Sequence, residues 1–198
     1  MLRTVAVLLV ASAATLGAQA AKIAVVPASS ITVEGTSNVH AWHLTSSTFT
    51  TEIEMVTPVD ALAKVQSVTL ALPVTTLKSG KGGLDKNTYK ALNAEKHPTI
   101  TFRMTSYSAV PSASAAKAIV KGVLAVNGVE KEVALDATIT GDAQSGLKAV
   151  GVTKFNMTDF GVKPVTALLG TIRTGNEVTI RFALTGSVAQ AVAMLPQH

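Results

Sequence analysis

The segment 84–105 reads LDKNTYKALNAEKHPTITFRMT, and its pattern of apolar residues changes half-way along. In the first half, Leu84, Tyr89 and Leu92 recur at roughly helical spacing among polar residues. Pro98 then ends that pattern, because proline disfavours helical backbone in the residue before it. In the second half, apolar residues alternate with polar ones: Ile100, Phe102 and Met104. The segment therefore predicts one short helix, a proline stop and a strand with one buried face.

Most of the remaining chain shows the same alternation, which is typical of antiparallel strands with one face in water. The clearest segments are 49–55, 68–72, 133–139 and 178–184, and weaker ones are 22–33, 118–126 and 147–155. Asn127-Gly128 favours a tight hairpin between two of these segments. Together with 98–107, these segments predict about eight strands in an all-β chain with a single helix. No linker or repeat divides residues 21–198, so we expect a single domain there.

Strands of this kind can close into a barrel or stack as a sandwich, and their periodicity does not separate the two architectures. An eight-stranded barrel is either filled by its own side chains or holds one small ligand. Aromatic residues make up only 4% of the chain, so aliphatic side chains supply most of the interior. Composition alone leaves both an apolar cavity and a tightly packed aliphatic core open.

The N-terminus has the three regions of a secretory signal peptide. Arg3 gives a positive start, 5–16 is an apolar run too short to span a membrane, and 18–20 is the small-x-small cleavage site AQA. We therefore expect residues 1–20 to be removed on export, and the mature protein to be periplasmic or secreted. The chain has no cysteine, which excludes disulfides, thiolate catalysis and cysteine-ligated zinc.

The formal net charge is +5, and the basic residues are scattered along the chain. No basic face or known motif for nucleic acid is visible, so we expect no nucleic-acid partner. Weak attraction to an anionic lipid or ligand is more compatible with an exported protein.

The segment 35–43, GTSNVHAWH, is the densest polar cluster and holds the only tryptophan. His40 and His43 are candidate metal ligands, but an i, i+3 pair does not share one face of a strand, and the usual ligand spacings are missing. We expect a tight corner instead, with Trp42 closing one end of a barrel. No G-x-S-x-G motif occurs, and no serine comes with a recognisable base. We therefore predict no catalytic and no metal-binding residues.

Four blocks together resemble the YceI-like family, exported bacterial proteins that bind polyisoprenoid lipids. They are ITVEGTSNVHAWHL at 31–44, LDKNTYKALNAEKHPTITF at 84–102, VKGVLAVNGVEKEVALDATI at 120–139, and KFNMTDFGV at 154–162 with NEVTIRFAL at 176–184. Each block is loose by itself, but they follow the order of the family over nearly all of the mature chain. One departure is that the arginine usual before Ser-Asp-Phe-Gly is absent from 156–161, NMTDFG, which favours a ligand with a neutral head group.

The resemblance implies an eight-stranded antiparallel β-barrel of lipocalin-like form with one helix beside it, and no catalysis. It also implies a long-chain isoprenoid lipid, such as a quinone or polyprenol, as the partner and the only bound group. The alternation and the resemblance together predict the cavity lining: Phe49, Ile53, Met55, Val68, Leu70, Leu72, Ile100, Phe102, Met104, Val133, Leu135, Ile139, Val178, Ile180 and Phe182. The alternative is a structural or stress-related module with a filled barrel. The oligomeric state stays open, with a homodimer as one option.

Overall fold

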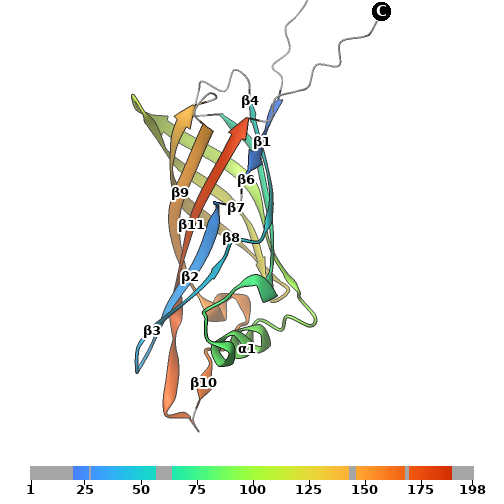
Figure 1. The fold of residues 1–198 in the computed structure, drawn as a ribbon, viewed down its shortest axis with the longest axis vertical. Coiled ribbons are helices and arrows are strands. Elements are labelled where there is room, and N and C mark those ends of the chain that lie inside the picture. The colour runs from blue at the N-terminus through green and yellow to red at the C-terminus, as the bar shows by residue number, and fades with distance from the viewer. Residues whose placement is uncertain (1–19, 27, 57–63, 143–145, 168–169, 189–198) are drawn as a thin grey trace, which may run out of the picture.

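The computed structural model describes residues 20–26, 28–56, 64–142, 146–167 and 170–188. Most of them belong to antiparallel strands that curl into one tall barrel (Figure 1). The predicted signal peptide falls outside the described residues except for Ala20, so it stays a prediction.

The strands account for nearly all of the regular structure. They are β1 (Ala20–Val25), β2 (Ser30–Ser37), β3 (Ala41–Ser46), β4 (Thr50–Val56), β5 (Val65–Pro73), β6 (Thr99–Pro111), β7 (Ala115–Val126), β8 (Val129–Asp142), β9 (Gly146–Asn156), β10 (Thr166–Ala167) and β11 (Ile172–Val188). The α-helix among the described residues is α1 (Gly82–Ala91), and two short 3₁₀ turns are η1 (Val74–Thr76) and η2 (Met157–Phe160).

Two strands of the closed barrel are each made of two pieces: β1 continues into β2, and β3 continues into β4. The β1–β2 strand pairs with β11 on one side and with the β3–β4 strand on the other. β1 and β2 both pair with β11, while β4 pairs with β1 and β3 pairs with β2. From β4 the order runs through β5, β6, β7, β8 and β9 back to β11, with every pairing antiparallel. With each interrupted pair counted as one strand and the two-residue β10 set aside, this is an eight-stranded barrel. The predicted fold class, an eight-stranded antiparallel barrel with one helix, is confirmed.

Serine side chains hold the two interruptions. Between β1 and β2, the Ser29 hydroxyl donates to the Thr185 carbonyl at 3.3 Å and accepts from the Thr185 N–H at 2.9 Å. Between β3 and β4, the buried Ser46 hydroxyl accepts from the Thr48 N–H at 3.1 Å and lies 2.7 Å from the Thr76 hydroxyl. These bonds replace part of the backbone ladder, so the strands change direction without leaving polar groups unpaired.

The segment 84–105 forms the predicted helix and strand. α1 ends at Ala91, and β6 begins at Thr99, directly after the proline. Asn127 and Gly128 have φ values of 53° and 76°, and this pair of positive angles forms the tight β7–β8 turn that the Asn-Gly dipeptide predicts. The imidazole of His97 packs so closely on Gly128 that a Cβ there would overlap the ring. This contact ties the chain after α1 to the barrel.

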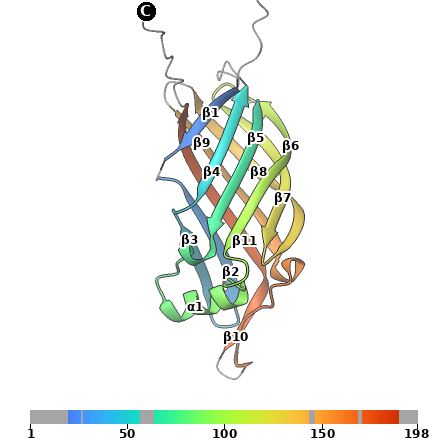
Figure 2. The same cartoon turned by 90° about the vertical axis from the view of Figure 1, so that its right-hand side faces the viewer.

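The β2–β3 hairpin, α1 and β10 gather at one end of the barrel, which we call the α1 end (Figures 1 and 2). α1 has no buried residue and lies across this end of the barrel. An antiparallel bridge between Thr45 and Lys78 brings the chain before α1 against β3. Within the described ranges, no helix is long and apolar enough to cross a membrane.

Candidate functional site

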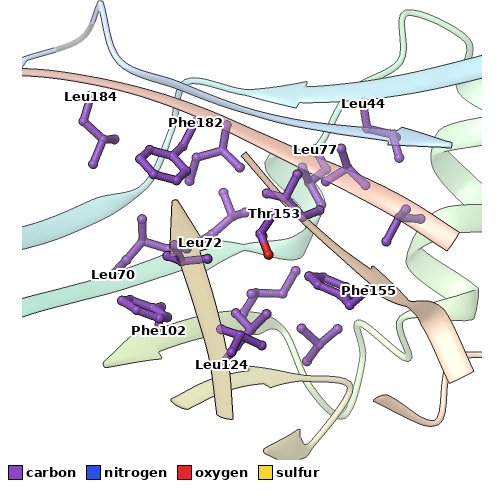
Figure 3. A pocket seen from close by; sticks show the side chains of 18 of the residues that line it. Leu44, Leu70, Leu72, Leu77, Phe102, Leu124, Thr153, Phe155, Phe182 and Leu184 are labelled. Atoms are coloured by element: carbon purple, nitrogen blue, oxygen red, sulfur yellow. The ribbon is translucent and has the colours of Figure 1, made fainter. Parts of the chain in front are cut away.

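The barrel encloses a cavity of about 580 Å³ whose wall is formed mainly by apolar side chains (Figure 3). Pockets that bind small molecules typically have volumes of about 300–1,000 Å³. The buried side chains form separate clusters on the wall: Met55 and Leu147 belong to one, and Val126 and Phe160 belong to another. The interior is therefore hollow, which resolves the choice between a cavity and a filled core that composition left open.

All but two of the predicted lining residues lie on the wall of this cavity. They are Ile53, Met55, Val68, Leu70, Leu72, Ile100, Phe102, Val133, Leu135, Ile139, Val178, Ile180 and Phe182. Figure 3 shows Leu70, Leu72, Phe102 and Phe182 around the same space. The period-2 alternation of four strong strand segments and of β6 points these side chains inward. Their role in holding a ligand remains a prediction.

Phe49 and Met104 are not among the lining residues, and each lies beside an irregularity that alternation does not reveal. Phe49 lies in the interruption before β4, where it packs against the cluster that includes Leu44 and Leu77. Met104 comes directly before a β-bulge, where the β6–β7 register shifts between Met104 and Ser106. After a bulge, the inward-facing positions of a strand switch from even to odd residue numbers, or the reverse.

Sequence reasoning missed part of the wall, including Ile23, Tyr107, Val120, Leu124, Leu147, Phe155 and Leu184. Tyr107 was hidden by the change of parity at the β6 bulge. Val120 could have been found, because the Asn-Gly turn fixes the β7–β8 register and pairs Val120 with Leu135. Residues paired in this way project to the same side of a sheet, so the inward direction of Leu135 implies that of Val120.

Three aromatic rings lie directly against glycines of the wall. A Cβ on Gly122 would lie 2.5 Å from Cζ of Phe102, and a Cβ on Gly151 would overlap the ring of Phe182. A Cβ on Gly35 would lie 2.7 Å from Cη2 of Trp42, whose Nε1–H donates to the Thr36 carbonyl at 3.1 Å. Because a glycine has no side chain, each ring occupies space next to the backbone that another residue would fill. These pairings help to leave the centre of the barrel open.

The exposed residues of the cavity wall all lie at the α1 end: His40, Lys81, Gly83 and Asn87. The other described lining residues are buried or half-buried, so within the described chain the cavity meets solvent at this end. We call this opening the mouth. Three more polar lining residues are Thr88 on α1, Ser37 at the end of β2, and Thr174, which pairs with Ser37 from β11. Among the described lining residues, Lys81 is the only lysine, arginine, aspartate or glutamate.

Trp42 lines the cavity at the mouth end but does not close it, because its ring lies on Gly35. The hairpin around it is organised by Ser37, whose hydroxyl accepts from the N–H of Val39 at 3.2 Å and of His40 at 3.1 Å. The expected corner is therefore the turn of a hairpin. Across the described part of the chain, no group of three His, Asp or Glu side chains could hold a metal ion.

Deeper in the cavity, Thr153 supplies an oxygen to an otherwise apolar region (Figure 3). Its hydroxyl donates to the Ala134 carbonyl at 3.1 Å, so its proton is already engaged. Among the described residues, no buried side-chain nitrogen or oxygen lacks a hydrogen-bond partner. The deep part of the cavity therefore offers mainly apolar contact.

Two polar contacts fix α1 beside the mouth. Asp85 accepts hydrogen bonds from the N–H and hydroxyl of Ser79 at 2.8 and 2.5 Å, and these bonds hold the pKa of Asp85 below its ordinary value. The Tyr89 hydroxyl lies 2.8 Å from the Leu77 carbonyl and accepts from Lys78 Nζ at 2.8 Å. That hydrogen bond raises the pKa of Lys78.

A family model for the YceI-like domain matches residues 18–186. The chain belongs to the YceI-like family. Solved structures of similar fold include Burkholderia cenocepacia BcnA, with 18% sequence identity, coverage of 82% of this chain and 99% of that chain, and a TM-score of 0.64. A Campylobacter jejuni YceI protein has 17% identity, coverage of 72% and 82%, and a TM-score of 0.58. A polyisoprenoid binding domain from Saccharophagus degradans, implicated in plant cell wall breakdown, has 8% identity, coverage of 87% and 100%, and a TM-score of 0.61. A search of curated proteins finds no match.

The segment 156–161, where the sequence resemblance lacks the usual arginine before Ser-Asp-Phe-Gly, runs through η2, and its Met157 lines the cavity. Met157 packs against the cluster that contains Phe160, and Leu92, the C-cap residue of α1, packs against the same cluster. Met157 thus supplies apolar surface to the wall, and the cation among the described lining residues is Lys81.

Proposed function

We propose that this protein binds one long apolar lipid of the polyisoprenoid class inside the barrel. The observation that carries the proposal is the continuous apolar cavity, which has few polar lining residues away from the mouth. Burying an apolar chain stabilises a complex by about 0.8 kcal/mol per CH₂ group removed from water. A long hydrocarbon tail therefore gains much from this cavity, and a small polar metabolite gains little. The polyisoprenoid binding domain of similar fold supports the same ligand class.

The lipid enters tail first and leaves its head group at the mouth. Head-group oxygens need hydrogen-bond donors, and the mouth supplies them from Lys81, Asn87 and Thr88. The far part of the wall, near Met55 and Leu147, is buried and apolar and suits the end of the tail. Because no described lining residue is a carboxylate, a cationic head group has no partner here. A neutral or anionic head rich in oxygen fits best.

The protein acts as a binding protein outside the cytoplasm, in the periplasm or the medium, after removal of its signal peptide. The N-terminal pattern of Arg3, the apolar run 5–16 and the small residues 18–20 supports export. Cell fractionation with an antibody against the mature chain tests this location. Full-length protein retained in the cytoplasm would contradict it.

Ligand binding is tested by extracting the purified protein with organic solvent and by measuring uptake of a fluorescent polyprenol analogue. We expect a polyisoprenoid in the mass spectrum of the extract and saturable uptake after delipidation. A barrel that yields no lipid and takes up no polyprenol or quinone analogue would overturn the proposal.

A pair of neighbouring variants on β7 locates the binding inside the barrel. Val120 lines the cavity, whereas Ile119 is 47% exposed on the outer wall. Val120→Trp should reduce the length of tail that the cavity holds and weaken binding of the longest analogues most. Ile119→Trp adds the same bulk to the outside and should leave uptake unchanged. Equal effects of the two variants would argue against binding in the interior.

A further inference from the structure

Helix α1 presents two different faces to its surroundings. Leu84, Thr88 and Ala91 line the cavity and share one side of the helix, as residues spaced by three or four positions do. Lys86 and Lys90, also four residues apart, are exposed and do not line the cavity. At about 100° per residue, Lys86 lies about 160° and Lys90 about 120° around the helix from Leu84. The helix therefore covers the mouth with its apolar side and turns two lysines outward.

These lysines are not neutralised by neighbouring acids. The ion pairs among the described residues are Lys154–Glu177 and Arg181–Glu34, and neither involves α1. Asp85 is the one acidic residue of α1, and it is already held by Ser79. Lys81, at the start of the helix, is also exposed. The outer surface of α1 is thus cationic and free to meet an anionic partner.

An exposed apolar residue lies at the same end of the barrel. Val39, at the turn of the β2–β3 hairpin, is 62% exposed. Its neighbour Asn38 fixes the turn, because the Asn38 side chain donates to the Thr171 carbonyl at 2.8 Å and accepts from the Arg173 N–H at 2.8 Å. Val39 is thus held on an ordered turn tied to β11. A fixed apolar tip at the same end as exposed basic side chains is a combination that suits the interface of a lipid bilayer.

We infer that the α1 end docks on the surface of an anionic phospholipid bilayer, with the mouth facing the membrane. The inference rests on the proposed function, since a lipid tail leaves a bilayer for the cavity at lowest cost when it does not cross water. Charge complementarity comes from Lys81, Lys86 and Lys90, and Val39 supplies apolar contact. Figures 1 and 2 show α1 and the β2–β3 hairpin at this same end.

The test is co-sedimentation of the purified protein with vesicles, either of phosphatidylglycerol mixed with phosphatidylcholine or of phosphatidylcholine alone. Each lysine near an anionic surface contributes about fivefold to the partition coefficient. Lys86→Gln/Lys90→Gln should therefore lower partitioning onto the anionic vesicles by about 25-fold. The matched control is Lys117→Gln/Lys148→Gln, which removes the same charge from exposed residues at the start of β7 and β9. The control should change partitioning by less than about threefold.

Three results would overturn the inference. They are no binding to the anionic vesicles at low salt, equal binding to both kinds of vesicle, and an equal loss in both double variants. Val39→Asp gives an independent check, because it should weaken vesicle binding without changing a lysine. The lipid content of each purified variant, measured by mass spectrometry, separates this inference from the proposed function. If the protein contains lipid but does not bind vesicles, only the proposed docking is refuted. If it never contains lipid, the proposed lipid-binding function is refuted.

Discussion

The contact between Gly35 and Trp42 gives the sharpest prediction about how the wall of this barrel is built. An added Cβ at Gly35 would meet three ring atoms of Trp42, among them Cε2 at 2.6 Å and Cη2 at 2.7 Å, and no backbone atom is among its nearest neighbours. Gly35→Ala must therefore displace the indole and break its hydrogen bond to Thr36. Overpacking and the lost hydrogen bond together should lower the free energy of unfolding by about 2 to 4 kcal/mol.

The indole can be removed to show that it is the cause. In a Trp42→Leu background, alanine at position 35 should stabilise the protein by about 0.5 to 1 kcal/mol, because glycine in a strand is less favourable than alanine. Urea unfolding followed by circular dichroism measures all four proteins of this cycle. Trp42 is the only tryptophan, so its fluorescence reports directly whether the ring moves in Gly35→Ala.

The control for the glycine replacement itself is Gly82→Ala, at a helical position where an added Cβ meets no atom within 4 Å. It should stabilise the protein by up to about 1 kcal/mol. Destabilisation of the same size by Gly35→Ala with and without the indole would refute the reasoning. An unchanged tryptophan emission spectrum in Gly35→Ala would do so as well.

Three further predictions concern the core and the helix. Leu72 is 3% exposed, so Leu72→Ala should cost about 2 to 5 kcal/mol in urea unfolding; Ile119→Ala should cost about 0.5 kcal/mol or less, and similar losses would contradict the assigned burial. Ser79→Ala removes one of two hydrogen bonds to Asp85, so the lowered pKa of Asp85 should rise toward its ordinary value in an NMR titration. The pKa of Asp85 is lower in the folded protein than in the unfolded chain, so its stabilisation of α1 is fully present above the unfolded pKa. This stabilisation is lost as the pH falls through the folded pKa, and amide hydrogen exchange in α1 should increase there. Tyr89→Phe removes the hydroxyl that holds α1 near Leu77 and should speed release of a fluorescent polyprenol, whereas an unchanged rate would show that α1 does not control the mouth.

The strong alternation determined much of the architecture and of the candidate site. Side chains in a strand alternate between two faces whatever surrounds them, so Leu70, Leu72, Ile180 and Phe182 could be placed on one inner face from spacing alone. The proline after α1 and the Asn-Gly turn are equally local, because they depend on the φ angles that single residues allow. These signals can be read from the sequence without knowing which strands pair.

The tertiary structure decided the features of the site that the alternation of apolar residues does not show. A bulge changes which positions of a strand face inward without changing its composition, which is why Tyr107, beyond the β6 bulge, joins the wall. Phe49 lies in the interruption between β3 and β4, and Met104 lies directly before the bulge; neither lines the cavity. Whether the interior is hollow depends on the volume enclosed by closure minus the volume of the side chains, and that difference is fixed by contacts between strands, such as Phe182 on Gly151. The mouth likewise forms only where α1 meets the end of the closed barrel. His40 and Lys81 are distant in sequence, and they line the same opening only after the barrel has closed.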